Sequence, residues 1–257
     1  MRFIISPAKK MRGSVECDRA LTEPVFIENA KMLSDWMKSL TLPELKKLWA
    51  CSDKLVADNA EQLKYMDLSR LTSPALLSYD GIQYTYMAPE VFQESEFDYV
   101  QAHVRILSGL YGVLKPFDAI VLYRLEMQAK AHVNGASNLY EFWGDSLYQE
   151  VCKGDGTIIN LASTEYSKVI EKYLTPDDTF ITCIFAEVRN VGDEQKLLQK
   201  GVYAKMARGS MLRYAAEIGA TSPDDLKTFT SLGYAFDVAH SNNSTFVFVR
   251  PEGWTAS

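Results

Sequence analysis

The sequence has few of the side chains that usually hold metal ions, and these few are far apart. It contains four cysteines and three histidines, with no C-x-x-C pair and no histidine cluster. This distribution gives no sign of a structural zinc site, a disulfide framework or a bound cofactor. Scattered single thiols are typical of the reducing cytoplasm, so we expect a cytoplasmic protein without a metal centre.

Long apolar runs and an excess of positive charge are also missing. The apolar run after Arg2 ends at Pro7, which is too short for a signal peptide, and no segment is long enough to span a membrane. The net charge of -6 argues against a protein that coats a polyanion with its whole surface. Any anion site would therefore be a local basic patch on an acidic body.

Short apolar runs alternate with amphipathic segments along the chain. The runs predict strands at 2–6, 74–79, 157–162, 180–188 and 245–250, and Tyr84 and Tyr86 follow at the strand period. Helical spacing predicts helices at 26–40, 95–106, 139–151, 201–209 and 224–229, with further helices starting near Thr41, Ser52 and Ser163. Residues 193–200 predict a hairpin or a short surface helix. No linker is visible in the 257 residues, so we expect one compact α/β domain over 1–257, with a mixed central sheet flanked by helices.

The stretch 105–127 combines features that an ordinary core segment does not need. Gly109 and Gly112 permit tight turns and close backbone approach, and Arg105, Lys115 and Arg124 are cationic. Two interpretations remain open. The stretch is either a binding site or its frame, or a tight connection with an ordinary ion pair between Arg124 and Glu126.

Further cations lie where ligands often bind in α/β proteins. Lys9 and Lys10 follow the first predicted strand, beyond its carboxyl end. Lys205 and Arg208 share one face of a predicted helix, and such a pair is better explained by an anionic partner than by stability. Ser163 begins a helix directly after a strand, which suits an anion but equally suits a plain N-cap. The lysines have an ordinary alternative as well, a solvated loop.

Two sets of candidate residues follow from these patterns. The anion- or DNA-binding candidates are Lys9, Lys10, Lys54, Arg105, Ser108, Gly109, Gly112, Lys115, Arg124, Asn160, Ser163, Lys205 and Arg208. The catalytic candidates are Glu126, Tyr111 and Tyr166, with Tyr84 and Trp143 as further members of an enzyme site. No nucleophile can be named.

Several motifs together resemble one known family. SPAK, SDKL, RILSGLYGVLKPFD with YRLEM, LYEFWGD, INLAS-EY and YAK-ARG occur in the order typical of the YaaA peroxide stress family and cover nearly the whole chain. The resemblance implies a cytoplasmic protein of unusual topology that limits damage from unincorporated iron. It also implies a positively charged cleft and duplex-DNA binding by a helix-hairpin-helix-like element. Met206 stands where the family often has a second lysine, and residues 107–112 match such an element poorly.

Three functions remain open. The first is DNA binding through the cationic cleft, with a steep dependence of affinity on salt. The second is an enzyme acting on a small anionic, nucleotide-like or carboxylate substrate, with Glu126 as acid or base and Lys205 and Arg208 as the anion clamp. The third is iron sequestration by Glu126, Asp145 and Glu165. A deep pocket would favour the enzyme, and an open trough would favour DNA.

Overall fold

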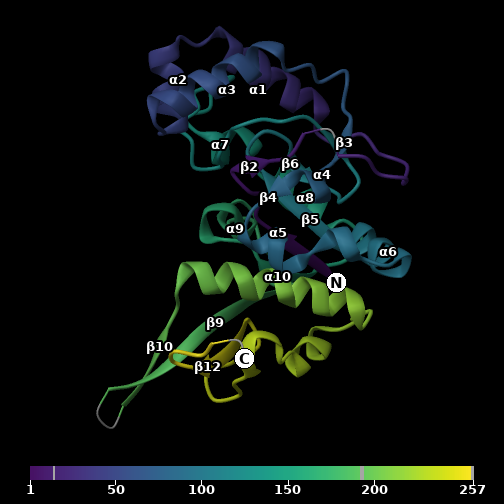
Figure 1. Cartoon of the computed structure of the whole chain (residues 1–257), viewed down its shortest axis with the longest axis vertical. Helices are drawn as coiled ribbons and strands as arrows, with labels where there is room; N and C mark the ends of the chain where they lie inside the picture. Colours follow the sequence, from purple (N-terminus) through teal and green to yellow (C-terminus); the bar gives the residue numbers. More distant parts are fainter. Residues whose placement is uncertain (14, 192–193, 256–257) are drawn as a thin grey trace.

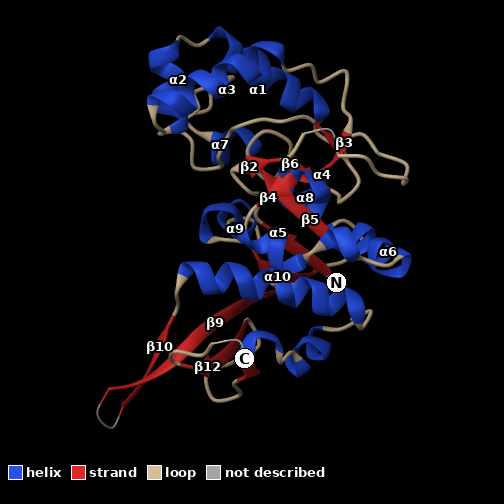
Figure 2. Cartoon of the chain, viewed as in Figure 1, coloured by secondary structure: helices blue, strands red, loops and turns tan. Residues whose placement is uncertain are grey.

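An eight-stranded mixed sheet forms the centre of the molecule (Figures 1 and 2). The structure is a computed structural model and describes residues 1–13, 15–191 and 194–255. The strand order is β11-β12-β9-β8-β1-β5-β6, and β10 pairs with β9. The strands of this sheet are β1 (Arg2–Ile5), β5 (Val104–Ser108), β6 (Gly112–Leu114), β8 (Thr157–Leu161), β9 (Thr179–Val191), β10 (Glu194–Leu198), β11 (Ala235–Phe236) and β12 (Thr245–Pro251).

The first strand lies in the middle of this sheet because both of its faces are buried. Phe3, Ile4 and Ile5 have no exposed surface, as expected for a parallel strand covered on both sides. β1 pairs in parallel with β5 on one side and with β8 on the other. The predicted strands at 2–6, 157–162, 180–188 and 245–250 are confirmed, and so is the mixed α/β class.

Helices flank the sheet and also gather at one end of the molecule, where α1, α2 and α3 lie together (Figure 1). The helices are α1 (Ile27–Ser39), α2 (Leu42–Trp49), α3 (Asp53–Tyr65), α4 (Ala75–Ser78), α5 (Ile82–Met87), α6 (Glu94–His103), α7 (Leu139–Trp143), α8 (Ser146–Cys152), α9 (Thr164–Glu171) and α10 (Gly201–Glu217), with 3₁₀ turns at Pro89–Val91, Pro223–Thr228 and Ser231–Gly233. Two small ribbons add β2 (Lys10–Met11) with β4 (Tyr79–Asp80), and β3 (Ser73–Pro74) with β7 (Ala119–Ile120). The predicted capping box is confirmed, because Glu44 accepts the Thr41 amide at 2.7 Å.

The longest helix, α10, packs closely against the short helix α5. A side chain at Gly209 would overlap the backbone carbonyl of Gln83, so only glycine permits this approach. The contact places α5 and α10 side by side (Figure 1). Both helices contribute side chains to the site described below.

Two predicted strand segments are wrong. Residues 75–78 form α4. The spacing of the apolar residues in so short a segment does not distinguish a helix from a strand. Tyr84 and Tyr86 lie on helix α5, where Gln83, Tyr84 and Met87 are the buried positions. This spacing is helical, so the alternation of the two tyrosines was coincidental.

The helix predicted at 95–106 is too long at its carboxyl end. It ends at His103, and Arg105 lies on β5, because Val104, Arg105 and Ile106 pair with β1. The stretch that follows is a buried hairpin of β5 and β6. Residues 107–112 therefore do not form a helix-hairpin-helix element. At residues 194–198 the hairpin interpretation is correct, and residue 193 lies outside the described residues.

Candidate functional site

The order in which the chain adds strands to the sheet reverses between the neighbouring strands β1 and β8. The next strand of this sheet after β1 is β5, which lies on one side of the pair, and the next strand after β8 is β9, which lies on the other side. Connections that diverge in this way leave a crevice outside the carboxyl ends of the two strands, where α/β proteins bind ligands. Ser6 and Ser163 follow the two strands and meet here. Ser6 Oγ accepts the Ser163 amide at 2.8 Å and donates to Ser163 Oγ at 3.2 Å.

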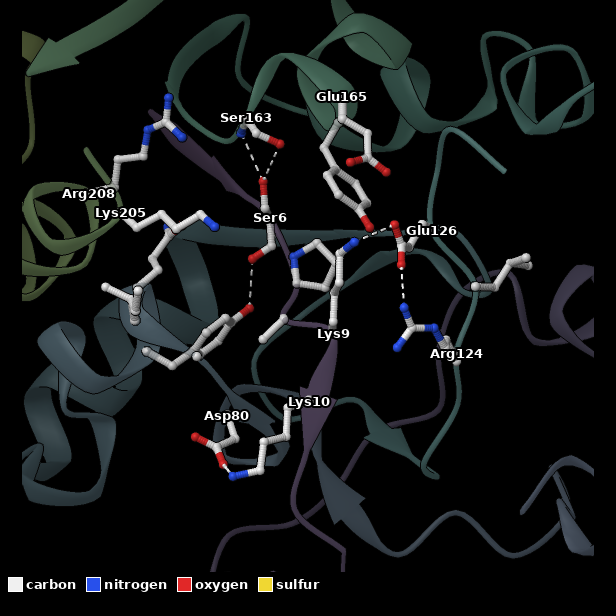
Figure 3. Close-up of a pocket in the computed structure, with 18 of the residues that line it drawn as sticks. Ser6, Lys9, Lys10, Asp80, Arg124, Glu126, Ser163, Glu165, Lys205 and Arg208 are labelled. Atoms are coloured by element: carbon white, nitrogen blue, oxygen red, sulfur yellow. Dashed lines mark hydrogen bonds and ion pairs between the residues drawn. The ribbon is translucent and has the colours of Figure 1, made fainter. Parts of the chain in front are cut away.

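A cavity of about 400 Å³ opens at this crevice (Figure 3). Its walls come from the segment after β1, the start of α5, the segment 123–126, the start of α9 and one face of α10. Five basic residues and three acidic residues line it: Lys9, Lys10, Arg124, Lys205, Arg208, Asp80, Glu126 and Glu165. Residues that are up to about 200 positions apart in the sequence therefore meet in one cavity.

On one side of the cavity, a carboxylate is matched by two cations. Glu126 lies 2.8 Å from Lys9 Nζ and 3.0 Å from an Arg124 nitrogen. The ion pair that was one interpretation of Arg124 therefore forms, and it forms inside the cavity wall. Arg124 Nε is buried without a hydrogen-bond partner in the described part of the chain.

At the rim, Lys10 pairs with Asp80 at 2.6 Å. The two residues face each other in the small ribbon of β2 and β4, so this pair is fixed by backbone pairing. Lys10 and Lys9 are nevertheless 79% and 65% exposed at their side chains. Exposed pairs of this kind are weak and screened by salt.

On the opposite side of the cavity lie two cations of α10. Lys205 and Arg208 lie one turn apart, and both line the cavity. Among residues 1–13, 15–191 and 194–255, neither has a carboxylate within 4.0 Å. Burial lowers the pKa of Arg208, and its Nε has no hydrogen-bond partner among these residues. In Figure 3 the two side chains lie across Ser6 from Lys9 and Glu126.

Glu165 reaches the cavity from the first turn of α9. Its Oε1 accepts the backbone amide of Gln128 at 3.2 Å, just beyond Glu126. Burial and, more weakly, the nearby charge of Glu126 raise the pKa of Glu165 and together outweigh the Gln128 amide, which lowers it. The surroundings of Glu165 therefore favour its protonated form.

Three tyrosines complete the wall. Burial raises the pKa of Tyr84 and Tyr166, and it raises the pKa of Tyr123 to about 12. All three hydroxyls are therefore protonated at neutral pH. The Tyr84 hydroxyl already donates to the Ser6 carbonyl at 3.0 Å, so Tyr84 fixes the turn that carries Lys9.

Several predicted site residues lie away from this cavity. Lys54 is exposed on α3. Arg105 is buried and donates to the carbonyl of Val104 at 2.7 Å. It shares a second, very small cavity with Lys115 and Asp118. Asn160 is buried on β8, where it accepts the Ala162 amide at 2.9 Å and shapes the turn before Ser163.

The glycine-rich stretch supports the site from behind. Ser108 Oγ accepts the amides of Leu110 and Tyr111 and contacts the Tyr123 hydroxyl at 2.7 Å. A side chain at Gly109 would overlap the Leu125 carbonyl, which lies between Arg124 and Glu126.

The rest of the stretch is internal as well. Gly112 has a positive φ of 72°. Tyr111 is buried and accepts the Val121 amide at 3.1 Å, and Trp143 donates to the Gly109 carbonyl at 3.2 Å. These residues hold the 123–126 segment in place and do not face the cavity.

Sequence reasoning missed Ser6, Asp80 and Gln83 as lining residues. Ser6 could have been found as the first polar residue after a buried strand. Asp80 and Gln83 carried no such signal. Their positions in the cavity depend on β4 and α5, and the sequence did not predict these two elements with the bounds that the structure has.

The carboxylates considered for iron do not assemble. Asp145 is exposed before α8 and does not line the cavity with Glu126 and Glu165. In the described ranges, no three His, Cys, Asp or Glu side chains are grouped so that they could hold a metal ion. No described helix is both long and apolar enough to cross a membrane.

Comparison with known proteins gives consistent matches over the whole length. Residues 1–240 match the family described as peroxide stress protein YaaA. A UPF0246 protein of Desulfitobacterium hafniense is 49% identical over 250 residues, covering 97% of this chain and 98% of its own length. UPF0246 proteins of Agathobacter rectalis and Lactiplantibacillus plantarum are 50% and 48% identical, each over 97% of this chain and 99% of their own length.

Proposed function

Since the chain belongs to the peroxide stress protein YaaA family, it is a peroxide stress protein, and we propose that it acts by binding a small anionic ligand in the cavity beside β1 and β8. The cavity volume of about 400 Å³ is that of a small-molecule site. A DNA duplex, whose major groove alone is about 12 Å wide, cannot enter a space of this size.

The observation that carries this proposal is the pair of cations on α10, which has no carboxylate within 4.0 Å among the described residues. Lys205 is exposed and Arg208 is partly buried, and a partly buried cation without an acid is unfavourable unless another anion compensates it. Lys205 and Arg208 face the cavity together. A phosphate or carboxylate bound beside them would compensate both cations.

The opposite wall offers groups for proton transfer. Glu126 and Tyr166 are the catalytic candidates that line the cavity, and Glu126 is held in place by Lys9 and Arg124. An enzyme acting on the bound anion would use these side chains to orient the ligand and move a proton. Binding is the first step of that activity and can be tested alone.

Isothermal titration calorimetry with adenosine 5′-monophosphate, ribose 5-phosphate and citrate tests the proposal. We expect Lys205→Ala and Arg208→Ala each to weaken binding about tenfold or more, because each removes a charged hydrogen bond of about 1.5–3 kcal/mol. Arg213→Ala on the same helix and Lys54→Ala are the matched controls and should bind normally. Equal binding by the α10 variants and the controls would refute the site.

Duplex DNA is a second candidate, favoured by the exposed lysines at the rim. DNA phosphates could contact Lys9 and Lys10 without entering the cavity. In that case, Lys9→Ala and Lys10→Ala would weaken duplex binding and reduce its salt dependence, because each removes about one phosphate contact. Lys205→Ala and Arg208→Ala would have a smaller effect, and the same titrations therefore separate the two functions.

We also propose that the protein acts in the cytoplasm and limits damage from unincorporated iron. Its four cysteines are free thiols, which suits a reducing compartment. The iron effect would be indirect, through the ligand of the cavity. Iron titration of the purified protein is the check, since stoichiometric binding that is lost in Glu126→Ala would favour direct sequestration.

A further inference from the structure

Two of the three carboxyl groups that line the cavity, Glu126 and Glu165, have unequal partners. Glu126 contacts one cation through each oxygen, Lys9 Nζ at 2.8 Å and an Arg124 nitrogen at 3.0 Å. Within the described ranges, Glu165 has no lysine, arginine or histidine nitrogen within 4.0 Å, and it accepts backbone amides, that of Gln128 at 3.2 Å and that of Met127. One group is a neutralised carboxylate, and the other lies beside it without a counter-charge.

The surroundings of Glu165 favour its protonated form. Burial is the largest influence and raises the pKa of Glu165, and the Glu126 charge raises it further, which together outweigh the Gln128 and Met127 amides and the charge of Lys9. Tyr166 and Tyr140 also lie close to Glu165, and both are protonated, because burial raises the pKa of each hydroxyl. A protonated Glu165 presents a hydrogen-bond donor, whereas the Glu126 carboxylate, which is ion-paired with Lys9 and Arg124, presents acceptors.

The two carboxyl groups and the α10 cations lie at different ends of the cavity. Figure 3 shows Lys205 and Arg208 on one side of Ser6, and Lys9, Glu126 and Glu165 on the other. The cavity is also lined by Pro7, Ala8, Ile82 and Tyr84, which add apolar surface. A ligand that fills the cavity meets cations at one end and a donor–acceptor pair at the other.

We propose that the cavity binds a two-ended ligand of the nucleoside monophosphate class. Its phosphate contacts Lys205 and Arg208, and its base edge accepts a hydrogen bond from Glu165 and donates one to Glu126. Adenine and cytosine carry this edge, a ring nitrogen acceptor beside an amino donor. The inference rests on the proposed anion site and specifies what lies at its other end.

Glu165 also has a structural role, because its Oε1 accepts the Gln128 amide and ties α9 to the segment after Glu126. Glutamine at this position would make the same contact and could also donate to a ligand. The substitution Glu165→Gln therefore preserves the donor and removes only the titration.

The experiment compares adenosine 5′-monophosphate and cytidine 5′-monophosphate with ribose 5-phosphate, which has the phosphate and no base edge. We expect both nucleotides to bind at least about tenfold more tightly than ribose 5-phosphate at pH 5.5, as one hydrogen bond to a charged group provides. The preference should shrink as the pH rises and Glu165 ionises. In Glu165→Gln it should persist at all pH values, and in Glu165→Ala it should be lost.

The outcomes separate this inference from the proposed function. Equal affinity for all three probes, or a pH-independent preference that survives Glu165→Ala, overturns the two-ended ligand and leaves the anion site intact. If neither ribose 5-phosphate nor the two nucleotides bind, the anion site and the two-ended ligand are both overturned. Thermal unfolding of each variant confirms that it is folded before its affinity is compared.

Discussion

The cations of the cavity and those of the carboxyl-terminal part of the sheet differ in their acidic partners. Arg250 on β12 is 2% exposed and pairs with Glu187 on β9, itself 1% exposed, at 3.0 Å. Lys200 contacts the other Glu187 oxygen at 2.6 Å. The Arg250 guanidinium also lies 4.3 Å from the centre of the Tyr203 ring and 4.8 Å from that of Tyr234. In the cavity, Lys205 and Arg208 have no such acid among the described residues.

The difference distinguishes charges that stabilise the fold from charges that are available to bind a ligand. Around Glu187, hydrogen bonds from Lys200 and Arg250 outweigh burial and lower the pKa of the carboxyl group. Around Arg208, burial outweighs the opposing influence of Cys183 and lowers the pKa of the guanidinium. Both sites lie beside α10. The difference between them therefore comes from the charged groups around Glu187 and Arg208 and not from their place in the fold.

The largest expected effect is on Arg250. Replacing it by methionine leaves Glu187 buried with one cation fewer, and we expect a loss of about 3–5 kcal/mol in the free energy of unfolding. Urea denaturation measures this loss. A variant as stable as the unmodified protein would show that the pairing of Arg250 with Glu187 does not stabilise the fold. The contrast with the cavity cations would then be wrong.

Gly209→Ala should have the next largest effect. The new methyl group overlaps the Gln83 carbonyl, and overpacking of this kind typically costs about 1–3 kcal/mol. Since the strain displaces α10 beside Arg208, anion binding should weaken together with stability. Calorimetry and urea denaturation of the same sample test the link, and normal binding in a destabilised variant would contradict it.

Arg208→Met is the matched counterpart of Arg250→Met. It removes a partly buried cation without leaving an unpaired acid, so the free energy of unfolding should change by less than about 1 kcal/mol or increase. Anion binding should nevertheless be lost. A destabilisation as large as that of Arg250→Met would place Arg208 among the structural charges.

The smallest expected effect is the pH dependence caused by Glu165. Because its pKa is raised in the folded protein, the folded state holds this proton more tightly than the unfolded state. Stability should therefore fall as the pH rises from the ordinary glutamate value to the raised one, and then stay level. The effect should be below about 1 kcal/mol, because the side chain is partly exposed. Melting temperatures of Glu165→Gln should lack this fall, and an identical pH profile would contradict the assignment.

Much of the local structure was visible in the sequence. The run Phe3, Ile4 and Ile5 predicts a buried strand, and the Thr41–Glu44 capping box predicts a helix start. The spacing of Lys205 and Arg208 places both on one face of α10. Elements with weak or mixed signals were wrong, as at residues 75–78, where no period distinguished a helix from a strand.

The sequence by itself determined the α/β class, the main strands and helices, and the family. Only the tertiary structure decided which charges are matched. It pairs Arg250 with Glu187 across 63 positions and places Lys9 beside Glu126, while Arg105, as cationic in sequence as Arg208, lies inside the sheet. The physical reason is range: periodicity and capping act within a few residues, whereas burial and charge pairing depend on neighbours brought together by the whole fold.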